Sequence, residues 1–215
     1  MTRIDKPIFI FGTGGFGRET LSCLLDVFEN EKREADGQIF FLVSDKLYDE
    51  KEILGFKVYP ASKFTPSMGR VVVAIGEPKI RKDIVESLPE NTDYTSIIHP
   101  SAKVSRWTEI GKGSIITAGC ILTCQIKLGK HAHLNLNSTI GHDCNIGDFF
   151  TTAPATNISG KCDIGEKVYF GTGAMVKQGI TICNDVIIGM GGVVLKNISD
   201  PGVYIGSPVK KLVRK

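Results

Sequence analysis

The chain has 215 residues, which is enough for two compact modules, and 42% of them are hydrophobic, which supports a buried core. Its formal net charge of +3 is too small and too dispersed to indicate a nucleic-acid or membrane partner. The first residues lead into one short apolar strand and not into a signal sequence. No apolar segment approaches the length of about 18 residues that a membrane span requires. We therefore expect a soluble cytoplasmic protein.

The first 95 residues alternate short apolar segments with amphipathic ones. Buried strands are predicted at residues 8–11, 39–43 and 71–75, and helices at residues 18–30 and 78–88. Pro78 stands near the first turn of the second helix, where its missing N–H costs little. Such alternation is typical of a small parallel sheet with helices packed against it. We predict one α/β domain over residues 1–95.

A glycine-rich turn joins the first predicted strand to the first predicted helix. Gly12, Gly14 and Gly17 match the pattern G-x-G-x-x-G, which lets the backbone and the helix amides approach a phosphate. Asp45 follows the second strand and could accept a hydrogen bond from a ribose or a base. The alternative is a tight turn without a ligand. The sheet is small for a complete dinucleotide site, so a nucleoside diphosphate that carries another group fits better than NAD.

Between residues 98 and 194 an apolar residue recurs at every sixth position. Only Thr152 interrupts this series, whose other members are Ile98, Val104, Ile110, Ile116, Leu122, Leu128, Leu134, Ile140, Ile146, Ile158, Ile164, Phe170, Val176, Ile182, Ile188 and Val194. The period indicates a parallel β-helix with three short sides per coil. The glycine that often follows, such as Gly141, would let the chain turn a corner. We predict an all-β domain of hexapeptide repeats over residues 96–199 and a short basic tail over 200–215.

The six cysteines are interpreted as reduced thiols. Cys120, Cys144 and Cys162 occupy the small-residue position of the hexapeptides, where a thiol packs like a small apolar group. No C-x-x-C pair is present. A disulfide framework or a zinc site is the alternative interpretation of the same count.

His142 and Asp143 stand together at a predicted corner of the repeat domain. A corner residue points away from the packed interior. A histidine there can accept a proton near neutral pH, and an adjacent carboxylate can fix its tautomer. The alternative is a solvated corner without a function. His131 and His133 raise the further alternative of a zinc site, as in β-helical carbonic anhydrases, but the H-x4-H spacing of those enzymes is missing. We expect no metal.

Together these features resemble the bacterial sugar acetyltransferases of the hexapeptide-repeat superfamily. The resemblance extends from the glycine-rich turn through the repeats to the Gly206-Ser207-Pro208-Val209-Lys210 ending. It is greatest for enzymes that N-acetylate nucleotide-linked 4-amino-4,6-dideoxy sugars of the bacillosamine, viosamine or perosamine type. It implies a Rossmann-like N-terminal domain, a left-handed parallel β-helix, a homotrimer, and acetyl-CoA bound between neighbouring β-helices. It also implies a role in the synthesis of a bacterial surface glycan such as lipopolysaccharide.

The resemblance also implies a set of site residues. The catalytic base falls on His142 and its acidic partner on Asp143. Contacts to acetyl-CoA fall on Thr151, Gly160 and Met190. Contacts to the nucleotide-linked sugar fall on Gly14, Gly15, Phe16, Ser44, Asp45, Gly76, Arg81 and Asn135. The chain departs from the family pattern at Thr151 and Phe16, because many members carry histidine at the first position and several carry it at the second.

The predicted function is therefore acetyl-CoA-dependent N-acetylation of a nucleotide-linked amino sugar. A second enzymatic alternative keeps the fold but acetylates a hydroxyl group, as the sialic acid O-acetyltransferases do. A third alternative is a trimer that binds a sugar nucleotide without catalysis. The intact His142-Asp143 pair argues against this last interpretation.

Overall fold

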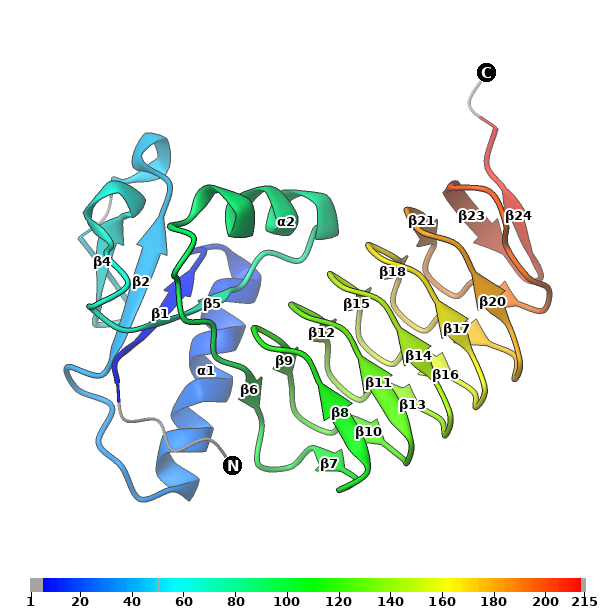
Figure 1. Ribbon diagram of the computed structural model, residues 1–215, viewed down its shortest axis with the longest axis horizontal. Helices are drawn as coiled ribbons and strands as arrows, with labels where there is room; N and C mark the ends of the chain where they lie inside the picture. Colours follow the sequence, from blue (N-terminus) through cyan, green and yellow to red (C-terminus); the bar gives the residue numbers. More distant parts are fainter. Residues whose placement is uncertain (1–5, 50, 214–215) are drawn as a thin grey trace.

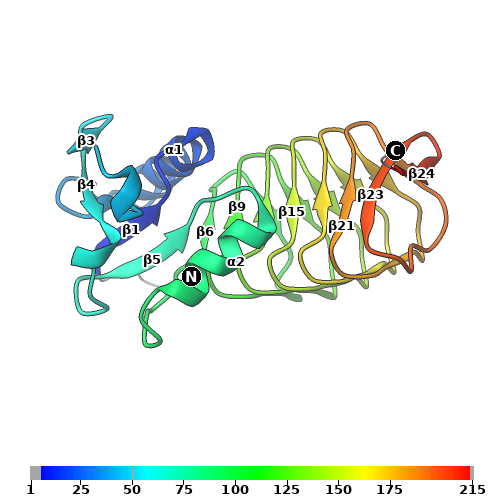
Figure 2. The same ribbon diagram turned by 90° about the horizontal axis from the view of Figure 1, so that it is seen from above.

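The computed structural model describes residues 6–49 and 51–213. An α/β unit is followed by a long parallel β-helix, whose coils stack away from that unit (Figure 1). Seen from above, the coils form one continuous column (Figure 2). This arrangement confirms the predicted fold class. Within the described residues, no helix has both the length and the apolar character needed to cross a bilayer.

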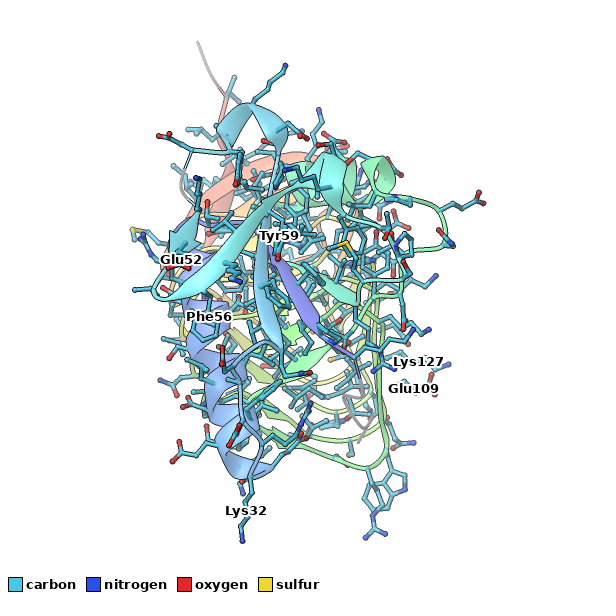
Figure 3. All side chains as sticks on the ribbon, turned by 90° about the vertical axis from the view of Figure 1, so that its left-hand side faces the viewer. Lys32, Glu52, Phe56, Tyr59, Glu109 and Lys127 are labelled. Atoms are coloured by element: carbon cyan, nitrogen blue, oxygen red, sulfur yellow. The ribbon has the colours of Figure 1, made fainter. Side chains whose placement is uncertain are left out.

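A five-stranded sheet of order β3-β4-β2-β1-β5 forms the centre of the α/β unit. Its strands are β1 (Ile8–Phe11), β2 (Ile39–Val43), β3 (Glu52–Ile53), β4 (Phe56–Pro60) and β5 (Arg70–Val73). Neighbouring strands are parallel except for β3 and β4, which pair antiparallel at the edge of the sheet, where Figure 3 labels Glu52 and Phe56. Every residue of β1 is buried, which explains its uninterrupted apolar sequence. The β3–β4 pair is absent from the sequence prediction because its strands are short and partly charged.

Helices cover both faces of this sheet. They are α1 (Gly15–Asn30) and α2 (Pro78–Ser87), and the unit also contains the short 3₁₀ segments η1 (Asp45–Leu47) and η2 (Ala61–Lys63). The apolar side of α1, including Leu24 and Phe28, packs against Ile8 and Ile10 on one face. On the other face, Ile84 of α2 packs in the cluster that contains Phe9 and Phe11. The predicted start of α1 is wrong by three residues, because Gly15-Phe16-Gly17 forms its first turn.

The β-helix has three sides, each a parallel stack of very short strands, with one antiparallel strand added at the end of the first side. The first side contains β6 (Ile97–Ile98), β9 (Ile115–Ile116), β12 (His133–Leu134), β15 (Thr151–Thr152), β18 (Tyr169–Phe170), β21 (Val186–Ile188), β23 (Gly202–Gly206) and β24 (Val209–Lys211). The second side contains β7 (Lys103–Val104), β10 (Ile121–Leu122), β13 (Thr139–Ile140), β16 (Asn157–Ile158), β19 (Met175–Val176) and β22 (Val193–Val194). The third side contains β8 (Thr108–Ile110), β11 (Ile126–Leu128), β14 (Asn145–Ile146), β17 (Asp163–Ile164) and β20 (Thr181–Ile182).

The apolar series of the sequence lies inside these coils. Ile116 pairs with Leu134, one coil later, and most of the series belongs to one buried cluster. Ile98 is 39% exposed, because it lies in the first coil and no earlier coil covers it. Thr152 is 1% exposed, and its hydroxyl bonds the Asn135 amide at 3.0 Å and the Ser138 hydroxyl at 2.8 Å. The interruption of the series is therefore a satisfied polar pair.

The glycines after the series residues have a different role from the one predicted. A Cβ on Gly141 would lie 2.5 Å from the amide nitrogen of Gly160, so glycine is required because two coils approach closely. The left-handed backbone at this corner belongs instead to Asp143, which has a φ of 58°. The same conformation recurs at Phe149 and Lys161, each three positions after its series residue. The corner is thus made by a non-glycine residue in the left-handed conformation, and the glycine makes room for the next coil.

The last segment of the chain continues the β-helix. Strand β23 pairs in parallel with β21, and β24 turns back against β23. The residues expected to form a basic tail therefore extend the first side of the column at its far end (Figure 1). All six cysteines are free in this structure, and burial raises the pKa of Cys23 to about 12.

Candidate functional site

His142 and Asp143 form a bonded pair at the corner between the second and third sides. The Nδ1 of His142 lies 2.7 Å from the Oδ2 of Asp143, and the two side chains are 46% and 42% exposed. An ionised carboxylate only accepts hydrogen bonds, so the Nδ1 of a neutral His142 carries the proton. The Nε2 of the same ring is then left with a free lone pair, as a general base requires. The positive φ of Asp143 turns its backbone at this corner beside the ring.

Gly160 lies one coil beyond His142 and borders its ring. A Cβ at position 160 would stand 2.7 Å from the Nε2 of His142, so the ring can occupy this place only beside glycine. The neighbouring amides of Ser159 and Lys161 donate to Val176 and His142, whereas the Gly160 amide has no backbone acceptor within the described part of the chain. An available N–H therefore lies next to the nitrogen that would accept a proton.

A cavity of about 290 Å³ lies between the α/β unit and the first side of the β-helix. It brings together four predicted residues, Phe16, Gly76, Asn135 and Thr151. The β-helix supplies two of them, and the α/β unit supplies the others. His133 and Glu19 also line this cavity. Neither of these two residues is among the predicted contacts to the sugar.

The start of α1 offers open backbone at the glycine-rich turn. Gly14 precedes the helix, and both Gly14 and Gly15 are exposed, with no atom within 4 Å of a Cβ built on either. Gly17 differs, because its Cβ would lie 1.9 Å from the carbonyl oxygen of Gly12. Gly14 and Gly15 therefore leave room for a ligand at the amides of a helix N-terminus, whereas Gly17 is needed for close packing against Gly12.

Ser44 and Asp45 lie where β2 ends. The Asp45 carboxylate accepts hydrogen bonds from the amide and the hydroxyl of Ser62, and these bonds lower the pKa of Asp45. The Ser44 carbonyl accepts a bond from the Leu47 amide at 2.9 Å in η1. In this structure Asp45 holds the β2 end to η2. Its predicted contact to a nucleotide stays a prediction.

The prediction that Arg81 contacts the nucleotide-linked sugar is corrected by the structure. The side chain is 0% exposed, and its guanidinium donates to backbone carbonyls on both sides of the junction between the α/β unit and the β-helix. Thr151 is 4% exposed and is bonded to this guanidinium at 2.9 Å. Because Arg81 is enclosed by protein atoms, no part of its side chain is open to a ligand in this structure.

The three residues predicted to bind acetyl-CoA do not come together within one chain. Thr151 borders the cavity on the first side, and Gly160 borders His142 at the corner between the second and third sides. Met190 follows β21 at the corner between the first and second sides, where it is 77% exposed. The three residues therefore lie on different sides and corners of the β-helix.

His131 and His133 are packed among aromatic and cationic groups. His131 stacks on Phe149 at 5.2 Å and meets the edge of Tyr94, and the His133 ring lies 4.9 Å from that of Phe16. Among residues 6–49 and 51–213 no group of three potential metal-binding side chains occurs. One sequence signal could have shown that the α/β unit covers the first side of the β-helix. The outward positions of the first side are uncharged residues or histidine, whereas those of the third side include Glu, Lys and Asp.

The burial of His131 predicts acid sensitivity of the fold. Burial, and then the charge of Arg81, lower the pKa of His131 to about 4. The unfolded chain therefore binds a proton that the folded protein excludes, and stability is lost as pH falls from about 6.5 towards about 4. The loss amounts to about 3 kcal/mol at the acid end of this range.

We expect the Tm to fall through this pH range and to fall less in His131→Phe, which keeps the aromatic packing. Thermal unfolding of both proteins across the range measures the difference. Some slope will remain in the variant, because burial also holds the pKa of His133 well below its usual value. Equal slopes in the two proteins would contradict the assignment to His131.

Comparisons with known proteins agree with this architecture. Residues 7–88 match the family model of the PglD N-terminal domain. The GDP-perosamine N-acetyltransferase of Escherichia coli O157:H7 is 34% identical over 186 residues, which cover 85% of this chain and 82% of that protein. The acetyltransferase domain of PglB from Neisseria gonorrhoeae FA1090, solved with acetyl coenzyme A, has a TM-score of 0.87 at 28% identity, with coverage of 96% and 99%.

A further solved structure shares the whole fold. PerB from Caulobacter crescentus, in complex with CoA and GDP-perosamine, has a TM-score of 0.84 at 26% identity and covers 97% of this chain and 98% of its own. The similarity to these proteins includes both the α/β unit and the β-helix. The chain therefore belongs to the hexapeptide-repeat acyltransferase family that contains GDP-perosamine N-acetyltransferase.

Proposed function

We propose that this protein transfers the acetyl group of acetyl-CoA to the amino group of a nucleotide-linked 4-amino-4,6-dideoxy sugar, as a step in bacterial surface glycan synthesis. The observation that carries the proposal is the His142-Asp143 pair, with its Nε2 left free beside Gly160. The identity of 34% to a GDP-perosamine N-acetyltransferase supports the amine as the acceptor. The solved relatives that contain acetyl coenzyme A or CoA support the donor.

The residues at this corner supply what acyl transfer from a thioester needs. The sugar nitrogen attacks the thioester carbonyl carbon, and the Nε2 of His142 takes a proton from that nitrogen. The oxygen of the tetrahedral intermediate accepts a hydrogen bond from the Gly160 amide. When the C–S bond breaks, the thiolate of CoA leaves and His142 returns the proton to it. No serine or cysteine nucleophile is required.

The nucleotide-linked sugar is proposed to bind at the α/β unit. Its diphosphate would lie on the amides at Gly14 and Gly15, and its sugar would extend toward the cavity lined by Phe16, Gly76 and Asn135. Where other family members carry histidine, Phe16 presents a phenyl ring that packs on His133. This position would make an apolar contact to the ligand in place of a hydrogen bond.

A homotrimer would bring the two halves of the site together. The cavity lies against the first side of the β-helix, whereas His142 lies at the corner between the second and third sides. The second side itself carries the exposed apolar residues Ile121 (44%) and Met175 (45%), and Leu195 (46%) follows its last strand. The third side points Glu109, Lys127, Asn145, Asp163 and Thr181 outward, two of which Figure 3 labels. We therefore propose that the second side packs against a neighbouring chain, with acetyl-CoA in the groove between them.

The acceptor is decided by one assay. The protein is incubated with acetyl-CoA and, separately, with GDP-, UDP- and dTDP-linked 4-amino sugars and with sialic acid, and the free thiol of CoA is measured. Release with an amino sugar, together with an acetamide in the product, supports the proposal. Release with sialic acid alone would show the O-acetyltransferase alternative. Binding of a sugar nucleotide without any thiol release would show a non-catalytic trimer.

Gly14→Val tests the phosphate contact without disturbing the fold. Nothing lies within 4 Å of a Cβ at position 14, and the φ there is −70°, so the substitution is sterically tolerated in the free protein. The valine side chain should instead obstruct the diphosphate. We expect a rise of at least about tenfold in the KM for the nucleotide-linked sugar, equivalent to about 1.4 kcal/mol, and little change in the KM for acetyl-CoA.

Gly37→Val provides the matched control. Gly37 also has open space around its Cβ, but it lies before β2 and away from the glycine-rich turn. Its φ of 66° adds strain, so this variant is expected to lose stability while both KM values stay the same. Equal increases of both KM values in Gly14→Val would show that the turn has only a structural role.

A further inference from the structure

Arg81 makes an unusual set of contacts for a wholly buried cation. Its Nη1 donates to the carbonyls of Ile75 at 2.6 Å and Gly76 at 3.1 Å, and lies 3.1 Å from the Nδ1 of His133. Its Nη2 donates to carbonyls of the β-helix, Phe149 at 2.7 Å and Phe150 at 3.1 Å, and to the Thr151 hydroxyl at 2.9 Å. The guanidinium therefore bonds both halves of the chain at once.

Within the described residues no carboxylate pairs with this guanidinium. Burial lowers the pKa of Arg81 to about 9, because the desolvated site disfavours the charged form. A buried cation is a costly way to join two surfaces, since apolar side chains of similar volume often join them at least as stably. Its fork of fixed N–H groups, however, defines the positions of several carbonyls more sharply than apolar packing does.

Three of the residues that are hydrogen-bonded to Arg81 line the cavity described above. Gly76 comes from the loop after β5, Thr151 from β15 and His133 from β12, and all three line the same space of about 290 Å³. Thr151 completes the link, because its hydroxyl accepts from Arg81 and donates to the Gly76 carbonyl at 3.1 Å. The Nδ1 of His133 accepts from Arg81, which fixes the ring that packs against Phe16.

We infer that Arg81, acting through Thr151 and His133, is a positioning residue for the acceptor substrate, which sets the spacing between the Gly76 loop and the β-helix that the nucleotide-linked sugar occupies. This inference rests on the proposed function for the identity of the ligand. It moves Thr151 from the acetyl-CoA site, where the family resemblance implies it, to the sugar side of the reaction. It also replaces direct contact by Arg81 with an indirect effect.

Thr151→Val is the sharper test, because it removes one hydroxyl and preserves the shape of the side chain. The Gly76 carbonyl then loses one of its two donors, while Arg81 stays in place. We expect the KM for the nucleotide-linked sugar to rise about fivefold to tenfold, as the loss of one hydrogen bond predicts. The KM for acetyl-CoA and kcat should change by less than about twofold.

Thr117→Val is the matched control. Thr117 is also buried, at 3% exposure, and its hydroxyl donates to the Leu134 carbonyl at 3.1 Å, but it does not line the cavity. It should lose about as much stability as Thr151→Val and keep both KM values. Arg81→Lys retains the charge without the fork, so its KM for the sugar should rise more than that of Thr151→Val. The KM of Arg81→Met for the sugar should rise further still. If Arg81→Met does not fold, the comparison of Thr151→Val with Thr117→Val decides the question.

Calorimetric binding of the GDP-, UDP- and dTDP-linked sugars to the same variants separates this inference from the proposed function. If the wild type binds one of them but transfers no acetyl group, the proposed function is overturned, and the ratio of dissociation constants still tests the positioning role. A higher KM for acetyl-CoA in Thr151→Val would overturn the inference. The inference would also be overturned if Thr151→Val had the same KM and dissociation constant for the sugar nucleotide as Thr117→Val. It would equally be overturned if the wild type bound none of the three sugar nucleotides.

Discussion

His142→Ala is expected to lower kcat by about 10²–10⁴-fold, the usual contribution of a positioned general base. The physical reason is the free Nε2 beside Gly160, the nitrogen on this ring that is left to accept the proton of the attacking amine. Affinity for acetyl-CoA should hardly change, because that ligand is expected to rest mainly on the coil backbone. Asp143→Asn should cost less than the alanine variant, since it weakens the base without removing it. Steady-state kinetics with both substrates varied measures each effect.

His99→Ala is the matched control for this experiment. His99 also bonds a carboxylate, with its Nε2 2.8 Å from the Oδ2 of Asp26, but it lies beside β6 and α1 at the start of the β-helix. Its removal should leave kcat unchanged. The comparison therefore separates the loss of a base from the loss of any histidine–carboxylate pair on this protein.

A rival explanation within the same reaction is that the sugar amine arrives already neutral. Proximity in the groove would then supply most of the rate. Under that explanation, His142→Ala would lose less than about tenfold, which lies below the usual range for a catalytic base. Such a result, in a variant that keeps its assembly, would contradict the assignment of His142 as the base. It would not contradict the assignment of the fold to an acetyltransferase.

Met175→Asp is expected to dissociate the assembly and to remove activity with it. Met175 is an outward residue of β19, the last but one strand of the second side, where it is 45% exposed in the single chain. If this side packs against a neighbour, the substitution buries a carboxylate without a partner, which is far more costly than burying a methionine. Light scattering should find about three times the chain mass of 23.4 kDa for the wild type and a single chain for the variant.

Thr181→Asp is the control, because it places the same charge six positions later on the third side of the same coil. This side is proposed to face water, so mass and activity should both be retained. Activity should fall with mass in Met175→Asp because the acceptor cavity and His142 belong to different sides of one chain. A fully active Met175→Asp monomer, or a monomeric wild type, would show that one chain contains the whole site.

Several features of the protein follow from the sequence alone. A coil of three sides needs an inward apolar residue on every side, so the period of six is visible without a structure and predicts the β-helix. The buried segments of β1 and β2 are equally visible, because a strand enclosed on both faces reads as a continuous apolar run. The His142-Asp143 pair is also predictable, since its two members are adjacent in the chain and their bond needs no distant partner.

The tertiary structure alone decides how the two halves meet. Arg81 bonds His133 and Thr151, which lie 52 and 70 positions away in the sequence. Its position in a charged helix gives no sign that it would be wholly buried. Thr152 likewise looks like a defect in the apolar series until Ser138 is found beside it. These contacts depend on the docking of surfaces remote in sequence, and no local pattern records which polar groups that docking brings together.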